Sequence, residues 1–433
     1  MWQRFTSLFA HKISRDLAWT AGSFASLGLC GIAVNLVIVH YYDAAMLGVF
    51  NVTYAVYLIG SQLASCGVHS SILRHIAYHQ QDRGLCGEIL GSALLLTIAS
   101  GVGAGLLLYM LAPFSAGLFG SPAIAEAIRV AAFGMVLFPL NKVLVHLLNA
   151  MQHMRAFALL QGMRYVIVLL VVVFVAMGQR DFRYAPLAFL GAELFTLVGG
   201  VFYLARGGWL PHLRVSRLWL SRHLRFGGKG MLGGIFVDLN TRLDVLLLGI
   251  LLSERAVGIY SFAAMLIDGM HYILAFIRVN MNPMLVIALR DGATERAQRM
   301  LAMSRRWVTA LTVLLGIGLF LGFTLLVELA LPGKGLSEGS LSLAILIGGF
   351  VLFAGYAPFD QLLLVSGHPG YQTAQCAVVT VVNAVLCLSL SPWLGIEGAA
   401  LATIGGYLSG MAFLMLLSPR LTGWNLLHNR FVR

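Results

Sequence analysis

Ionisable side chains interrupt the long apolar stretches of this 433-residue chain, and their types are suited to binding chemistry. Guanidinium and ammonium groups bind phosphate, and guanidinium does so through two parallel hydrogen bonds. Carboxylates in an apolar setting bind Na⁺ or carry a proton. We interpret one set as a binding surface for an anionic headgroup: Arg242, Arg164, Lys142, Arg278 and Arg74. We interpret a second set as candidates for ion coupling: Asp268, Asp244, Asp238, Asp360 and Glu193.

Each of these charges also has a purely structural interpretation. Asp238 and Arg242 are four residues apart, so they share one helix face and can form an ion pair. Arg74 and Arg278 lie near predicted helix ends, where a long side chain reaches the membrane surface. The acids as a group can balance the arginines. The sequence leaves both interpretations open.

The composition decides which elements carry these residues. The chain is 59% hydrophobic and only 11% charged, and its mean hydropathy is +0.86. Soluble domains are about 25% charged, so this chain needs lipid as its solvent. A membrane helix requires about 20 apolar residues. The apolar runs are long and continuous, unlike the short alternating strands of a β-barrel. Twelve spans are predicted: Trp19–Val39, Gly48–Val68, Ile89–Leu111, Ile128–Leu148, Phe157–Met177, Leu187–Leu204, Met231–Leu252, Val257–Ile277, Trp307–Leu329, Leu341–Val365, Thr373–Trp393 and Gly398–Leu417.

The distribution of basic residues predicts the orientation. With the N-terminus inside, 20 of the 29 Lys and Arg residues fall in inner segments, 4 in outer segments and 5 within spans. Inner loops of membrane proteins carry this excess, so both termini are expected in the cytoplasm. The net charge of +12 therefore indicates a cytoplasmic face that meets anionic lipid, and no nucleic-acid partner is needed to explain it.

An internal repeat divides the spans into two groups of six. Residues 47–51 match residues 257–261 at an offset of 210. Residues 134–138 match 349–353 at an offset of 215, and Leu147, Leu148 and His153 match Leu362, Leu363 and His368 at the same offset. Because six spans restore the starting side, the repeats are parallel, and such bundles enclose a cleft. We predict an all-α polytopic membrane protein with about 12 transmembrane helices, arranged as two pseudo-symmetric six-helix bundles around a central cavity.

The predicted organisation has five parts. Residues 1–17 form an amphipathic N-terminal segment in the interface, for which the alternative is a disordered tail. Residues 18–205 and 230–418 are the two bundles. Residues 206–229 are a basic cytoplasmic linker, and residues 419–433 are a cytoplasmic tail.

Several function classes lack their sequence signatures. The sequence has neither a Gly-x-x-x-x-Gly-Lys-[Ser/Thr] phosphate loop nor an HExxH metal motif. Its five cysteines lack metal-ligand spacing and are interpreted as packing residues: Cys30, Cys66, Cys86, Cys376 and Cys387. We therefore expect a carrier rather than an enzyme, with no bound cofactor and with a Na⁺ or proton gradient as a candidate energy source.

Four segments carry a family resemblance. They are Arg242–Gly249, Val257–Ala264, Arg225–Gly228 and Gly395–Ala400. Together with the twelve-span layout, they resemble the polysaccharide-transporter branch of the multidrug/oligosaccharidyl-lipid/polysaccharide exporter superfamily, which includes O-antigen and exopolysaccharide flippases.

The resemblance implies a substrate and a cellular location. The substrate would be an undecaprenyl-pyrophosphate-linked oligosaccharide, moved by alternating access from the inner to the outer leaflet of the bacterial cytoplasmic (inner) membrane. The process served would be biosynthesis of surface polysaccharide, such as lipopolysaccharide O-antigen, with a polysaccharide polymerase and glycosyltransferases as partners. The peptidoglycan-precursor branch has fourteen spans, so the twelve predicted here disfavour that substrate.

Other functions remain open at this stage. The runner-up is a cation-coupled exporter of drugs or other small molecules, which should have an acidic rather than a basic cavity. A membrane enzyme of glycan assembly is less favoured, because a polymerase should carry a large external loop. A scaffold subunit of a secretion complex is the remaining alternative.

Overall fold

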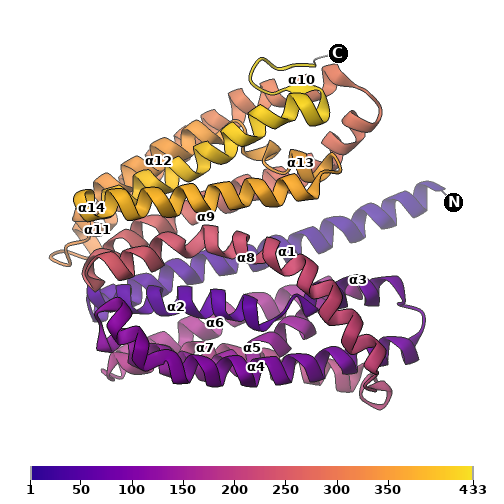
Figure 1. The fold of residues 1–433 in the computed structure, drawn as a ribbon, viewed down its shortest axis with the longest axis horizontal. Coiled ribbons are helices and arrows are strands. Elements are labelled where there is room, and N and C mark those ends of the chain that lie inside the picture. Colours follow the sequence, from indigo (N-terminus) through magenta and orange to yellow (C-terminus); the bar gives the residue numbers. More distant parts are fainter. Residues whose placement is uncertain (1, 432–433) are drawn as a thin grey trace. The chain divides into compact units, whose positions relative to one another are not determined.

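The computed structural model describes residues 2–431, except for the side chains of residues 2–17, 24, 211, 229, 230, 232, 233 and 237. The described chain is helical apart from turns and one short β-hairpin, and it forms two compact units (Figure 1). The predicted amphipathic face of residues 1–17 lies outside the described side chains, although the backbone is helical from Trp2.

Unit 1 comprises the chain up to Tyr42 and Thr53–Asp238. Its helices pack lengthwise, α1 against α6, α4 against α5, and α7 against both α5 and α6. Its complete elements are α1 (Trp2–Tyr41), α3 (Val68–Tyr78), α4 (Arg83–Phe119), α5 (Pro122–Ala150), α6 (Met154–Met177), η1 (Phe182–Tyr184), α7 (Leu187–Arg206) and η2 (Leu210–His212).

Unit 2 comprises Asp43–Val52 and the chain from Leu239 onward. In this unit α12 packs against α9, α11 and α14. Its complete elements are α9 (Glu254–Arg290), α10 (Thr294–Met303), the π-helical turn η3 (Ser304–Val308), α11 (Thr309–Ala330), η4 (Leu336–Gly339), α12 (Ser340–Ala354), η5 (Ala357–Phe359), α13 (Leu362–Val365), α14 (Pro369–Thr422), β1 (Trp424–Asn425) and β2 (Arg430–Phe431).

Two helices belong to both units. The helix α2 (Ala44–Ala64) begins in unit 2 and ends in unit 1, and α8 (Arg217–Leu251) begins in unit 1 and ends in unit 2. The second half of the predicted basic linker is therefore helical and continues into the seventh predicted span.

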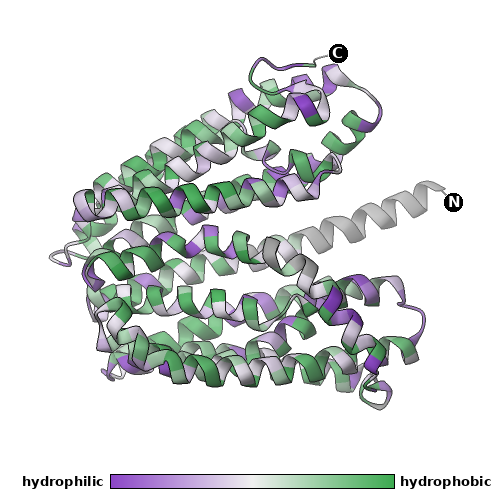
Figure 2. Ribbon diagram, in the orientation of Figure 1, coloured by the Kyte–Doolittle hydropathy of each residue, from purple (hydrophilic) through white to green (hydrophobic). Residues whose placement is uncertain are grey.

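Ten described helices are long and apolar enough to cross a membrane. The last, α14, contains both of the final predicted spans, and its helical backbone is interrupted at Gly395, whose φ is 61°. The seventh predicted span lies in α8, which is not among the ten. Figure 2 shows apolar residues along the middles of the helices and hydrophilic residues mainly at their ends and in turns.

Two predicted spans are wrong in their boundaries. The span Gly48–Val68 ends early, because Cys66 and Gly67 take positive φ angles of 45° and 66° between α2 and α3. The span Leu341–Val365 is broken between α12 and α13, where Pro358 cannot donate a backbone hydrogen bond. Polar residues flank both breaks, but the average hydropathy over each predicted span stays high, so the average carried each span across its break.

The predicted repeat is confirmed by a reciprocal contact in unit 2. A methyl group at Gly48 of α2 would overlap the carbonyl oxygen of Glu254, and one at Gly258 of α9 would overlap that of Ala44. Both pairs differ by 210 residues, so each repeat presents the same segment to the other. Glycine here lets two helix backbones touch, as it does in other membrane helix pairs.

The turns after the fourth span of each half also match. The amide of His153 donates to the carbonyl of Leu148 (2.9 Å), and that of His368 donates to the carbonyl of Leu363 (2.8 Å). Each histidine then precedes the first turn of the next helix. These pairs keep the offset of 215, so the repeat extends to individual hydrogen bonds.

A further match was missed in the sequence. Gly208-Trp209 follows α7 and Gly423-Trp424 follows α14, again at an offset of 215. Both glycines have left-handed φ angles, 67° and 70°, which turn the chain back onto its own bundle. Both tryptophans are buried in the apolar cores at the predicted cytoplasmic ends.

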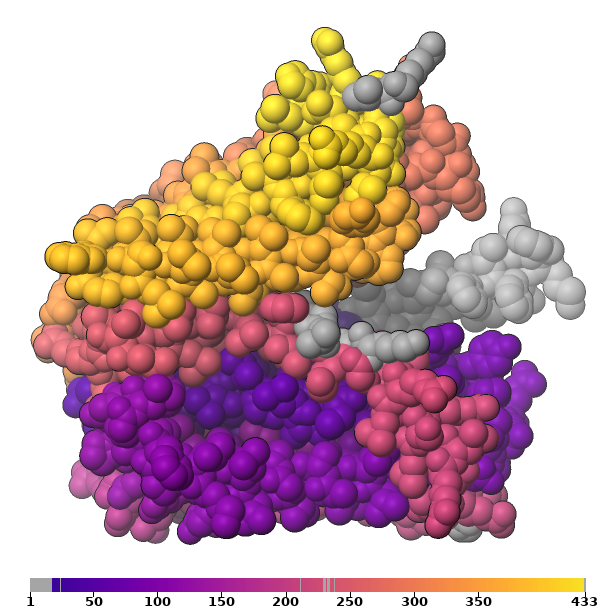
Figure 3. All heavy atoms as spheres, viewed as in Figure 1, coloured from indigo at the N-terminus to yellow at the C-terminus, as the bar shows by residue number. Residues whose placement is uncertain are grey.

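The C-terminal hairpin closes that end of unit 2. Gln298 of α10 and Asn429 exchange two hydrogen bonds of 2.9 Å, and the Trp424 ring stacks on that of Phe431 at 5.3 Å. Figure 1 shows the hairpin beside α10, and in Figure 3 its yellow atoms pack against the rest of unit 2. The predicted tail is therefore ordered through Phe431.

The linker histidine His223 is buried at the corresponding end of unit 1. Its Nε2 is 3.0 Å from the carbonyl oxygen of Ile89, so Nε2–H donates there, and Nδ1 accepts from the hydroxyl of Ser71 at 2.8 Å. This arrangement fits the neutral ring, and burial lowers the pKa of His223 from 6.5 to about 4.

We predict that Gly48→Ala destabilises the protein by about 1–3 kcal/mol, because the new methyl group displaces the α9 backbone. Gly103→Ala is the matched control, since a methyl group there meets nothing within 4 Å. The measurement is thermal unfolding in detergent. Equal melting temperatures for the two variants would show that the α2–α9 contact is not made.

We predict that acid destabilises unit 1 through His223. Its folded pKa lies below its unfolded value, so the unfolded chain binds the proton first. The stability from neutral His223 is complete above about pH 6.5 and falls by up to about 3 kcal/mol as the pH drops toward 4. Denaturant unfolding across this range should show a steeper pH dependence for wild type than for His223→Gln, and identical slopes would contradict the assignment.

Candidate functional site

The predicted charges of unit 1 gather around Glu193 on α7. Its carboxylate pairs with Arg164 of α6 and accepts hydrogen bonds from Asn141 Nδ2 (2.7 Å) and the Tyr57 hydroxyl (3.3 Å). Only 1% of Glu193 is exposed. Three partners from three helices therefore fix this carboxylate, and through it the guanidinium of Arg164.

Phe138 of α5 holds two cations near one aromatic ring. The guanidinium carbon of Arg164 lies 4.5 Å from the ring centroid, and the ammonium of Lys142 lies 5.7 Å from it. Lys142 also donates a hydrogen bond to the side-chain oxygen of Gln62. The ring quadrupole favours cations at such distances, so Phe138 helps to keep Arg164 and Lys142 close together.

The two remaining predicted residues of unit 1 differ in their relation to that pair. Asp238 of α8 attracts Lys142 electrostatically. Arg74 of α3 is exposed, and its guanidinium carbon lies 5.1 Å from the ring centroid of Phe226. Arg74 therefore lies at the predicted cytoplasmic end of the unit, away from the buried charges.

In unit 2, Arg242 of α8 pairs with Asp268 of α9 at 3.2 Å. The helical spacing had suggested Asp238 as a partner for Arg242; the structure adds Asp268 from a neighbouring helix, and Asp238 also attracts Lys142. Asp244 is bound locally, because its carboxylate accepts from the Tyr260 hydroxyl (2.5 Å) and from the amide of Val245 (2.8 Å).

The second ion pair of unit 2 joins Arg278 of α9 to Asp360 at 3.2 Å. Gln375 of α14 donates to the other oxygen of Asp360 at 3.2 Å. Next to this pair, Asn282 donates to the side-chain oxygen of Gln361 at 2.9 Å. Asp360 lies at the break after η5, so the interruption of the tenth predicted span places a carboxylate opposite α9.

The three arginines of the predicted site that lie within spans, Arg164, Arg242 and Arg278, are half-buried, and each has a carboxylate partner. Burying a charge without a partner costs several kcal/mol, which explains the pairing. The expected cationic lining is thus largely compensated in this conformation. An anion that binds one of these arginines must displace the carboxylate paired with it.

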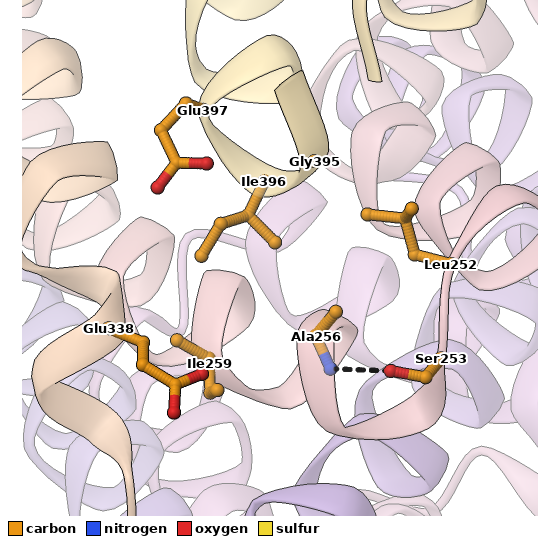
Figure 4. Close-up of a pocket in the computed structure, with 8 residues that line it drawn as sticks. All are labelled: Leu252, Ser253, Ala256, Ile259, Glu338, Gly395, Ile396 and Glu397. Carbon is orange, nitrogen blue, oxygen red and sulfur yellow. Dashed lines mark hydrogen bonds between the residues drawn. The ribbon is translucent and has the colours of Figure 1, made fainter. Parts of the chain in front are cut away.

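A pocket of about 310 Å³ in unit 2 lies elsewhere (Figure 4). Its lining residues are Leu252, Ser253, Ala256, Ile259, Glu338, Gly395, Ile396 and Glu397. Two glutamates face it, and Ser253 caps α9 by accepting from the amide of Ala256 (3.3 Å). None of the predicted site residues lines this pocket, and its charge is opposite to the one that an anionic headgroup needs.

Sequence reasoning missed the neutral members of these clusters. Tyr57, Gln62 and Asn141 in unit 1 and Tyr260 in unit 2 are uncharged, so they do not stand out in an apolar span. Asn141 directly precedes Lys142, and this polar pair in the middle of a span was the one available signal.

The chain matches known proteins at two levels. The sequence model for polysaccharide biosynthesis proteins matches residues 31–286, more than half of the chain. The comparison with curated proteins gives no match.

Solved structures share the fold. A multidrug-resistance transporter of the MATE family in the MOP superfamily, inward-facing, is 13% identical with a TM-score of 0.75, over 91% of this chain and 94% of the other. The lipid II flippase MurJ, inward closed, is 13% identical with a TM-score of 0.73, over 92% and 87%. A MOP superfamily transporter from Pyrococcus furiosus is 14% identical with a TM-score of 0.63, over 95% and 96%.

We predict that Glu193→Ala destabilises unit 1 by about 3–5 kcal/mol, because it leaves the Arg164 charge buried without its partner. The double variant Arg164→Met/Glu193→Met should regain most of that loss. The control is Asp181→Ala, which removes the exposed pair with Arg183 and should cost at most about 1 kcal/mol. Thermal unfolding of the purified variants is the measurement, and equal costs for Glu193 and Asp181 would refute the role of the buried pair.

Proposed function

The chain belongs to the polysaccharide biosynthesis protein family, and on that premise we propose that it is a flippase for lipid-linked glycans. Its substrate would be an undecaprenyl-pyrophosphate-linked oligosaccharide repeat unit, moved from the inner to the outer leaflet of a bacterial cytoplasmic membrane. The product would enter the biosynthesis of a surface polysaccharide such as O-antigen or exopolysaccharide.

One observation carries the proposal, the pair of cations at Phe138. Arg164 and Lys142 bring two positive groups into the membrane-spanning part of unit 1, near one aromatic ring. Basic groups at membrane depth are costly and usually serve a substrate path. A pyrophosphate carries two phosphoryl groups, so two neighbouring cations match it in number.

The acids supply a proposal for energy coupling. Asp268 and Asp360 each hold an arginine through one ion pair, and Asp244 shares its oxygens with Tyr260 and a backbone amide. A proton or Na⁺ that binds such a carboxylate weakens its hold on the arginine. We infer that the gradient acts on the ion pairs of unit 2, while the cations of unit 1 receive the headgroup.

A cation-coupled exporter of small molecules is the second candidate. The observation that favours it is the excess of acids among the predicted site residues of unit 2, where Asp244, Asp268 and Asp360 outnumber two arginines. This candidate predicts the binding of organic cations rather than of pyrophosphates.

We predict that Arg164→Ala and Arg242→Ala abolish surface glycan while the protein remains in the membrane. Because Arg164 lies in a buried pair, Lys142→Gln is the second variant, and Arg183→Ala in an exposed pair is the control. The measurement is glycan export in cells and flipping of a lipid-linked oligosaccharide in proteoliposomes, with the ion gradient imposed or collapsed. Normal export and flipping by all three variants would exclude the flippase proposal.

A further inference from the structure

Lys142 is held differently from the three half-buried arginines of the predicted site. Each of those arginines makes a direct ion pair with a carboxylate. The ammonium of Lys142 instead donates to the neutral amide of Gln62 and lies near the ring of Phe138. Neutral partners orient a cation without cancelling its charge. Of the two cations at Phe138, Lys142 is therefore the one that can more easily change its counter-ion.

The carboxylate that acts electrostatically on Lys142 is Asp238 of α8. The side-chain nitrogen of Gln62 lies so close to α8 that a methyl group at Gly234 would overlap it. Asp238 follows Gly234 by four residues and so lies on the same face of α8, one turn further along. Lys142, Gln62 and this face of α8 thus form one group within unit 1, and Asp238 attracts Lys142 across it.

Asp238 also has a distinct place in the chain. It is the last residue of unit 1, and Leu239 on the same helix is the first residue of the second part of unit 2. A continuous helix transmits movement along its axis. A rearrangement of unit 2, if it occurs, would reach the Asp238 carboxylate along α8, whereas Glu193 is held inside unit 1 by three partners.

We propose that Asp238 is a competing counter-ion for Lys142, which displaces the anionic headgroup and so sets its affinity and its release. The inference rests on the proposed function, because it takes a pyrophosphate as the competitor. When the headgroup binds, Lys142 exchanges Asp238 for phosphate oxygens. When α8 brings the carboxylate back, the headgroup loses one of its two cations and leaves.

The test is equilibrium binding of a fluorescent short-chain polyprenyl pyrophosphate to the full chain in detergent. Removing the competing charge in Asp238→Asn should tighten binding about tenfold, mainly through slower dissociation. Asp238→Glu should restore the wild-type affinity. In the Lys142→Gln background, Asp238→Asn should have no effect. Asp291→Asn, which removes an exposed carboxylate at the end of α9, is the matched control and should leave the affinity unchanged.

The outcomes separate the two proposals. Weaker binding by Lys142→Gln together with unchanged or weaker binding by Asp238→Asn would overturn the role of Asp238 and leave the flippase proposal standing. A tightening that persists in the Lys142→Gln background would also overturn it. If the wild-type chain does not bind the pyrophosphate, or if Lys142→Gln and Arg164→Ala both bind it as wild type does, the proposed function fails and this inference fails with it.

Discussion

The contact between α2 and α9 at Gly48 and Gly258 is the constraint on which the rest of the arrangement depends. Two helix backbones touch there, and each repeat supplies the same segment. Inside a membrane there is little hydrophobic gain in bringing helices together, and close packing has to supply the attraction. The contact also explains why the first residues of α2 belong to unit 2 while the remainder of α2 belongs to unit 1. The first half of the chain is thereby anchored in the second unit.

The buried charges follow a second physical rule. In an apolar medium a charge persists when a partner of opposite sign lies close to it. Glu193 and Asp360 each have one arginine and neutral hydrogen-bond donors, and Asp268 has one arginine, so the number of opposite charges does not distinguish them. Their exposure does: the side chain of Glu193 is 1% exposed, whereas those of Asp268 and Asp360 are 37% and 31% exposed. An ion from water therefore reaches the carboxylates of unit 2 more readily than it reaches Glu193.

Much of the fold could be predicted from sequence, because hydropathy and the positions of Lys and Arg report directly on the solvent around each helix. The breaks at Cys66–Gly67 and around Pro358 could not, since the average hydropathy over a whole span stays high across each of them. The ten charged candidates were identified, because a charge in an apolar run is conspicuous. Their partners on other helices were not, because spacing along one helix shows only local neighbours: it suggested Asp238 for Arg242, but it could not show Asp268, which packing brings from α9. The neutral groups Tyr57, Gln62 and Asn141 were missed for the same reason, since their roles arise from helix packing.

The repeated Gly-Trp turns place natural optical probes in the molecule. Trp209 and Trp219 are 5% and 2% exposed in the core of unit 1, and Trp424 is fully buried in that of unit 2. In contrast, Trp307 and Trp393 are 63% and 87% exposed. Trp307 and Trp393 lie at the ends of predicted spans, where an exposed side chain meets the membrane, so a quencher carried by lipid should reach this pair and not the buried tryptophans. Variants that keep a single buried tryptophan, with every other tryptophan replaced by phenylalanine, would let the fluorescence of each unit be followed separately, without an added label.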